Sequence, residues 1–127
     1  MKNFLLLLTC FLLLTNLQSQ AMTFEQAYNE MYSKPAMVIV YADWADNYQA
    51  YLNNFRKLKS VFGNRYNYVE LDIASKDAKF YNSRYPINTN LPYVYIYSCG
   101  GKKARFINRQ CASDTSCMVS KIKYTMQ

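Results

Sequence analysis

The sequence predicts an α/β domain with a central mixed four-stranded sheet flanked by helices. Residues Ala36–Tyr41 form an unbroken apolar run rich in β-branched side chains, which is typical of a strand covered on both faces. An amphipathic helical pattern follows over residues 45–62, and a second strand pattern follows that helix. Two more short strand patterns flank Gly100-Gly101 near the end of the chain.

Residues 1–21 have the features of a secretory signal peptide. Lys2 gives a positive start, residues 4–15 are apolar and uncharged, and Ser19-Gln20-Ala21 is a suitable cleavage site. The apolar run is too short to span about 30 Å of hydrocarbon as a helix. Cys10 lies inside the run, which argues against a lipoprotein. We therefore expect a secreted or periplasmic protein with residues 22–127 as one domain and no transmembrane anchor.

The chain is basic, with 15 Lys and Arg residues against 8 Asp and Glu residues and a net charge of +7. The surplus lies late in the chain, where six cations accompany a single carboxylate: Lys102, Lys103, Arg105, Arg109, Lys121 and Lys123, with Asp114. This is either an ordinary solvated surface or a patch that weakly contacts anionic envelope material. Nucleic acid is not an expected partner for an exported protein.

The inventory of reactive side chains is short. The sequence contains no His, which excludes His-ligated zinc sites and the Cys-His and Ser-His-Asp nucleophile systems. Cys99, Cys111 and Cys117 remain after signal removal. No metal or cofactor is expected.

The first half of the domain contains two predicted helices. Residues 23–33 form the first, with Thr23 and Gln26 as a capping box and Pro35 ending it. The second, over residues 45–62, has Asp43 or Asp46 as its cap and Gly63 after its end. Its apolar face consists of Tyr48, Tyr51, Leu52, Phe55, Leu58 and Phe62.

The second half contains the remaining strands. Residues 66–72 form a strand that completes a βαβ unit, residues 76–84 a short helix and residues 85–90 a loop. Tyr93–Ser98 is the third strand, with its tyrosines on one face and Val94 and Ile96 on the other. Gly100-Gly101 is expected to be a two-residue turn before an antiparallel strand over residues 103–108. Ser113 or Asp114 then caps a last helix, whose inward residues are Met118, Val119, Ile122 and Met126.

Several of these segments together resemble the thioredoxin family over most of residues 36–108. The resemblance is carried by Tyr41-Ala42-Asp43-Trp44 after the first strand, by the long helix, by Leu71-Asp72, and by Leu91-Pro92 before the tyrosine-rich strand. It implies the thioredoxin fold with a cis-Pro92 before the third strand. The segment between Asp72 and Pro92 is a few residues longer than in a minimal thioredoxin.

The departures from the family pattern concern its chemistry. Ala45-Asp46-Asn47-Tyr48 stands where the family has Cys-x-x-Cys, whose first thiolate is activated at a helix N-terminus. Ile39 takes the place of a buried proton-carrying carboxylate, and Asn53 that of a helix-kinking Pro. We therefore expect no catalytic residues and a loss of dithiol exchange.

The resemblance still implies a binding surface for an exported protein or peptide. By position this surface comprises Trp44, Ala45, Asp46, Asn47, Tyr48, Leu91 and Pro92. Binding would pair a strand with the backbone and place an aromatic contact on the ligand. The alternative is that Trp44 only packs on its loop and Pro92 only shapes the chain.

The late cysteines allow a disulfide. A turn between Cys111 and Cys117 can bring their Cα atoms within the roughly 4.4–6.8 Å that a disulfide needs, whereas Cys99 lies a strand length away. We predict a Cys111–Cys117 bond with Cys99 free. Three plain thiols remain an alternative, as does a thiol–disulfide oxidoreductase that uses these cysteines.

Overall fold

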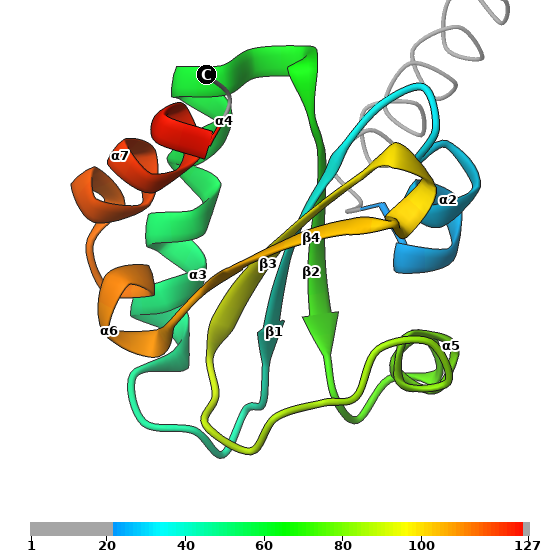
Figure 1. Ribbon diagram of the computed structural model, residues 1–127. Coiled ribbons are helices and arrows are strands. Elements are labelled where there is room, and N and C mark those ends of the chain that lie inside the picture. Colours follow the sequence, from blue (N-terminus) through cyan, green and yellow to red (C-terminus); the bar gives the residue numbers. More distant parts are fainter. Residues whose placement is uncertain (1–21, 126–127) are drawn as a thin grey trace, which may run out of the picture.

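The computed structural model describes residues 22–125. The predicted signal peptide and Met126 lie outside these residues. A four-stranded sheet forms the centre, in the order β2-β1-β3-β4 (Figure 1). Its strands are β1 (Ala36–Tyr41), β2 (Asn67–Asp72), β3 (Tyr93–Ser98) and β4 (Lys103–Ile107). Strand β1 is parallel to β2 and antiparallel to β3, and β4 is antiparallel to β3, so the predicted mixed sheet is confirmed.

Helices cover both faces of the sheet (Figure 1). One face carries α2 (Phe24–Asn29) and α5 (Lys76–Asn82), and the other carries α3 (Tyr48–Arg56), α4 (Leu58–Phe62), α6 (Arg109–Ala112) and α7 (Thr115–Thr125). Tyr93 and Tyr97 are buried on the α2 side, while Val94 and Ile96 are buried on the α3 side. The predicted division of β3 between two cores is therefore confirmed. Among the described residues, no helix is both long and apolar enough to cross a membrane.

Helix α2 begins as the capping box requires. Thr23 Oγ1 accepts the Gln26 amide at 3.2 Å, and Gln26 Oε1 accepts the Thr23 amide at 3.0 Å. The helix ends at Asn29, earlier than predicted. Asp77, in the first turn of α5, accepts the amides of Phe24 and Glu25, so a single carboxylate joins the N-termini of two helices on this face.

The prediction of one long helix over residues 45–62 is wrong in two respects: the helix starts later, and it is divided into α3 and α4. It begins at Tyr48, and the residue before it, Asn47, is left-handed with φ 59° and makes no side-chain cap. Neither Asp43 nor Asp46 caps it. The predicted helix is also interrupted at Lys57, and α4 starts at the next residue. The Lys57 carbonyl accepts the amide and the hydroxyl of Ser60. Gly63 follows α4, as predicted, and its φ of 61° is a conformation that glycine adopts without steric cost.

The β3–β4 connection also differs from the prediction. Ser98 pairs with Lys103, so four residues, not two, make the turn. The first three of them form η2 (Cys99–Gly101), a short turn in which all three residues have positive φ. The Gly100 amide donates to the Met31 carbonyl at 3.3 Å, and this contact with the α2–β1 connection holds the wider turn in place.

The predicted last helix is α7, and a short helix that was not predicted, α6, precedes it. Asn108 Oδ1 accepts the Cys111 amide at 2.9 Å at the start of α6, and Asp114 Oδ1 accepts the Ser116 amide at 3.0 Å at the start of α7. Capping by Asp114 is thus confirmed, whereas the cap at Asn108 was not foreseen. Met118 and Ile122 are buried, and Val119 packs at the edge of the same core.

Candidate functional site

The Trp44 loop and the Leu91-Pro92 segment leave the sheet at the same edge. Val40, near the end of β1, pairs with Tyr93 at the start of β3, so the residues after β1 and those before β3 lie side by side (Figure 1). The Leu91–Pro92 peptide bond is cis. The structure therefore places all seven residues of the predicted binding surface around one edge of the sheet.

These seven residues are not equally accessible. Trp44 is 67% exposed, and Asp46 and Asn47 are exposed beside it. Leu91 and Pro92 are buried beneath this edge. The Leu91 amide donates to the Thr89 carbonyl at 3.0 Å, so a bound strand cannot use this donor. The open part of the surface is therefore the loop, with Trp44 as its largest apolar side chain.

Two turns support the exposed loop from below. The Ala45 amide donates to the Ala42 carbonyl at 3.1 Å, and the Tyr48 amide donates to the Ala45 carbonyl at 3.3 Å. Ala42 is buried, and Ala45 packs against the α2-side core. The backbone is therefore held at both ends while the Trp44 side chain points away from the core.

A tyrosine pair extends the site along α3. The rings of Tyr41 and Tyr48 stack with centroids 5.8 Å apart and planes 2° apart. They line a depression of about 320 Å³ together with Gln49, Leu52, Asn53 and Arg56. Burial, reinforced by the nearby carboxylates of Asp72 and Glu70, raises the pKa of Tyr41, so its hydroxyl remains protonated at neutral pH. No sequence pattern pointed to this stack, because it joins a strand end to a helix start.

One ion pair borders this depression. Arg56 Nε and Nη2 donate to the two carboxylate oxygens of Glu70 at 2.9 and 2.7 Å. The carboxylate raises the pKa of Arg56, chiefly through the hydrogen bond. This bidentate pair connects α3 to β2 and leaves the aromatic side of the depression open.

The residues that the sequence resemblance aligns with the dithiol positions of thioredoxins carry other groups. Ile39 is fully buried under α3 with Leu52 and Phe55. Ala45 and Tyr48, at the two Cys positions, supply no sulfur. Within residues 22–125, no group of three or more His, Cys, Asp or Glu side chains is arranged to hold a metal ion.

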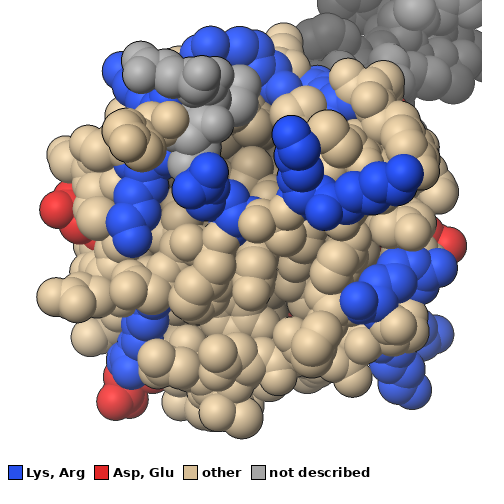
Figure 2. Space-filling view, in the orientation of Figure 1, with Lys and Arg blue, Asp and Glu red and all other residues tan. Residues whose placement is uncertain are grey.

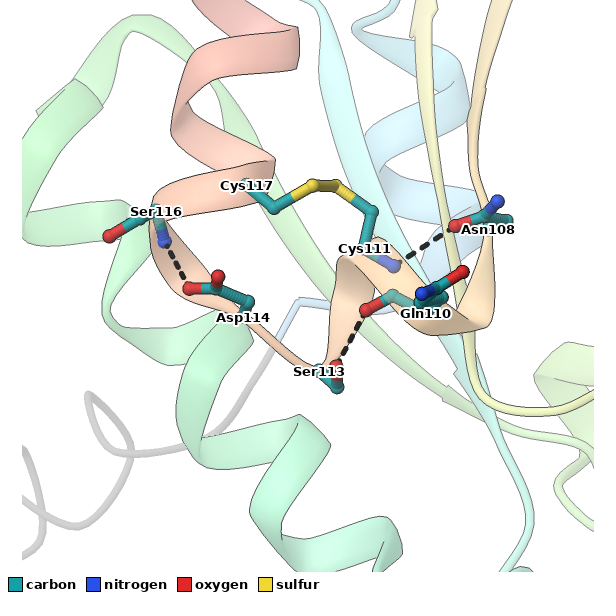
Figure 3. The surroundings of a disulfide bond; sticks show 7 residues. All are labelled: Asn108, Gln110, Cys111, Ser113, Asp114, Ser116 and Cys117. Atoms are coloured by element: carbon teal, nitrogen blue, oxygen red, sulfur yellow. Dashed lines mark hydrogen bonds between the residues drawn. A yellow bond between two sulfur atoms is a disulfide. The ribbon is translucent and has the colours of Figure 1, made fainter.

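The predicted disulfide is confirmed, and Cys99 is free. Cys111 and Cys117 are joined with a Cα–Cα distance of 5.4 Å, linking α6 to α7 across the turn between them (Figure 3). Cys99 is exposed at the hairpin tip, beyond the end of β3 opposite to the Trp44 edge. The six residues of β3 separate these two places by about 20 Å.

The disulfide segment is attached to the second half of α3. Asn54 Nδ2 donates to the Ser113 carbonyl at 2.9 Å, and Thr115 Oγ1 donates to the Asn54 carbonyl at 3.4 Å. Cys111 is buried against the α3-side core, whereas Cys117 is half-buried beside a groove of about 440 Å³. Both cysteines line that groove, with Asn108, Gln110, Ser113, Asp114 and Lys121.

Comparison with known proteins agrees with the fold. No family model matches the sequence, and no curated protein matches it. Among solved structures, a malarial protein superposes with a TM-score of 0.59 at 13% identity, covering 72% of this chain and 97% of that one. The Trx4 domain of ERdj5 superposes with a TM-score of 0.63 at 17% identity, covering 80% and 90% of the two chains.

A third solved structure is a chain from the complex of ferredoxin: thioredoxin reductase with thioredoxin f2. It superposes with a TM-score of 0.64 at 13% identity, covering 82% of this chain and 88% of that one. Likeness at these identities concerns the fold alone. The chain has the thioredoxin fold, as the resemblance in its sequence implied.

Proposed function

We propose that this protein is an exported thioredoxin-fold domain that has lost the dithiol site and binds a protein or peptide at the Trp44 surface. That surface consists of Trp44, Ala45, Asp46, Asn47, Tyr48, Leu91 and Pro92. The observation that carries the proposal is that Trp44 is 67% exposed on a loop whose backbone is held by hydrogen bonds on both sides of it, from Ala45 to Ala42 and from Tyr48 to Ala45. Export rests on the signal peptide predicted for residues 1–21.

Trp44 is suited to be the main anchor of a bound partner. Tryptophan is enriched among the few interface residues that carry most of the binding energy, and truncating such an anchor commonly costs 2 kcal/mol or more. The depression beside Tyr41 and Tyr48 would take a neighbouring side chain of the partner. Asp46 places an exposed carboxylate at the rim, where it would favour a basic residue.

The proposed loss of dithiol exchange at this surface rests on three residues. Ala45 cannot form the attacking thiolate, and Tyr48 cannot resolve a mixed disulfide. Ile39 can neither accept nor donate a proton under the helix. Because nucleophile, resolving group and proton carrier are all replaced, restoring one of them alone would not restore exchange.

Trp44 provides its own probe, because it is the sole tryptophan of the sequence. Fluorescence of the free protein should resemble that of a water-exposed indole. A peptide library is selected on immobilised protein, and the enriched peptides are titrated while emission is recorded. Binding at the proposed surface shifts the emission to the blue as Trp44 loses water.

Because Trp44→Ala removes the emission signal, its affinity is measured by fluorescence anisotropy of the labelled peptides. The variant should weaken these peptides at least tenfold and change the free energy of unfolding by less than about 0.5 kcal/mol, as for other exposed sites. Tyr32→Ala is the matched control, since Tyr32 is an aromatic residue 79% exposed near the hairpin tip. Equal affinity of wild type and Trp44→Ala, or no shift of emission on binding, would refute the proposal.

A second candidate function is a thiol–disulfide oxidoreductase that uses the late cysteines. The groove beside Cys111 and Cys117 favours it, because a substrate could approach the half-buried sulfur of Cys117 there. In that reaction the reduced pair is oxidised to the Cys111–Cys117 disulfide while a substrate disulfide is reduced to two thiols. Insulin reduction by dithiothreitol is measured with wild type, Cys99→Ser and the Cys111→Ala/Cys117→Ala double variant. Turnover that requires the pair would establish this function instead.

A further inference from the structure

We infer that the outer edge of β4, with the groove beside it, binds an extended acidic peptide segment. This β4 edge site is separate from the Trp44 surface. It is formed by Lys102, Lys103, Ala104, Arg105, Phe106, Lys121 and Tyr124. Strand β4 is last in the strand order, so within the described sheet one of its edges has no neighbouring strand. Residues Lys103 to Phe106 are all exposed. An open edge with free backbone groups is a template for a further strand.

The charge of this edge specifies the sign of the partner. Lys103 and Arg105 lie on one face of β4, opposite Ser98 and Ile96 of β3. Lys102 precedes them, and Lys121 of α7 lies across the groove. Figure 2 shows Lys and Arg gathered in a band across the upper part of this face, with Asp and Glu at its margins. The ion pair found within residues 22–125 joins Arg56 to Glu70, so these four cations remain available to a ligand.

The same cations disfavour a second copy of the chain at this edge. Edge-to-edge pairing would bring Lys103 and Arg105 of one copy against the same residues of the other, and like charges opposite each other destabilise a strand pair. Lysine on an exposed edge is a common protection against such pairing. An acidic segment is favoured at the same edge, because its carboxylates would lie next to these cations.

The shape of the groove indicates an extended ligand. One depression of about 790 Å³ is lined by the five consecutive residues from Lys102 to Phe106, together with Pro35, Tyr66, Ile96 and Ser98. A second, of about 440 Å³, is lined by Arg105, Phe106, Ser120, Lys121 and Tyr124. The two share Arg105 and Phe106 and lie on the side of the sheet that carries Ile96 and α7, so together they border β4 on the face of Lys103 and Arg105. Five residues of a strand span about 17 Å, the length of a short extended peptide.

Two exposed aromatic side chains border the cations, with Phe106 on the other face of β4 and Tyr124 on α7. Phe106 is 42% exposed and packs against Tyr95 with centroids 5.1 Å apart, and Tyr124 is 80% exposed on α7. They offer apolar contact to residues that alternate with acids along the ligand. Backbone pairing distinguishes a peptide from an anionic glycan, because a glycan has no regular series of amides to pair with the strand.

The test uses a labelled eight-residue peptide of alternating Glu and Val, with binding followed by fluorescence anisotropy. Two further peptides carry N-methyl groups on one or the other alternate set of amides. A paired strand directs alternate amides to its neighbour, so one N-methylated peptide should lose at least tenfold in affinity while the other binds within twofold of the parent. Heparin serves as a polyanion without a peptide backbone.

Variants locate the site. Lys103→Glu/Arg105→Glu should reduce affinity at least tenfold. Lys57→Glu/Lys59→Glu makes the same change of charge at exposed positions around the α3–α4 junction and should alter affinity less than twofold. Trp44→Ala should leave the affinity unchanged, which separates this site from the Trp44 surface. Equal affinity for both N-methylated peptides would overturn the inference, and so would binding of heparin without binding of the parent peptide.

Discussion

Removing the Cys111–Cys117 bond should lower stability by an amount set by its short loop. The two cysteines are 6 positions apart, and the loop-closure entropy of a cross-link of this size corresponds to about 2 kcal/mol at 25 °C. For a domain of this size, 1 kcal/mol shifts the melting temperature by roughly 4–8 °C. The Cys111→Ala/Cys117→Ala variant should therefore melt about 8–16 °C lower than the oxidised protein.

Urea unfolding followed by far-UV circular dichroism provides the measurement. Wild type is compared oxidised and after reduction with a phosphine, and the double variant is compared with both. Reduced wild type and the double variant should have similar midpoints below that of the oxidised protein. Cys99→Ala is the matched control, because Cys99 is free and exposed. It should change the free energy of unfolding by less than about 0.5 kcal/mol.

A stabilising role of the bond would be excluded if oxidised and reduced protein unfolded at the same urea concentration with the same slope. The bond would then contribute nothing to the folded state. Its retention would favour the oxidoreductase function, in which the pair cycles between both forms. A loss of about 2 kcal/mol without turnover of insulin supports a structural bond that joins α6 to α7.

Two further predictions concern the tyrosine-rich core. The hydroxyls of Tyr81 and Tyr97 lie 2.5 Å apart, and both side chains are fully buried. Tyr97→Phe should lower the free energy of unfolding by about 1–3 kcal/mol, because it leaves the Tyr81 hydroxyl buried without a partner. The double variant Tyr81→Phe/Tyr97→Phe should recover much of this loss, because no unpaired hydroxyl remains. Additive losses in the double variant, measured by urea unfolding, would contradict this account. Burial is also the first cause of a raised pKa in Tyr66, Tyr81, Tyr93 and Tyr97, so the unfolded chain releases these protons at lower pH than the folded protein does. Stability should thus be insensitive to these groups below pH 10 and should fall as pH rises above about 10, and an unchanged urea midpoint between pH 9 and 11 would contradict it.

Those parts of the fold that depend on local pattern could be read from the sequence. The apolar run Ala36–Tyr41 and the alternating strand Tyr93–Ser98 have the predicted bounds. The Thr23–Gln26 capping box and the cap at Asp114 also formed as expected, because each involves groups no more than three residues apart. The Cys111–Cys117 pairing belongs here too, since a short turn brings the two sulfurs together.

The candidate site could be located from the sequence but not described. The resemblance placed Trp44 and Leu91-Pro92 at one edge, and the pairing of Val40 with Tyr93 brings them there. Their different exposure depends on what packs beneath the loop, which no local pattern contains. The stack of Tyr41 on Tyr48 likewise depends on how the chain turns between them.

The order of the strands, the helices between them and the two-sided burial of the sheet could thus be predicted from local patterns in the sequence. The tertiary structure decided where helices start and how turns close. The hairpin at Gly100 is wide because the Gly100 amide donates to the Met31 carbonyl, and α6, which was not predicted, is followed by a turn that Asn54 holds at Ser113. These contacts join residues tens of positions apart, so their free energy enters only when the chain has folded and can override the local preference for a tighter turn.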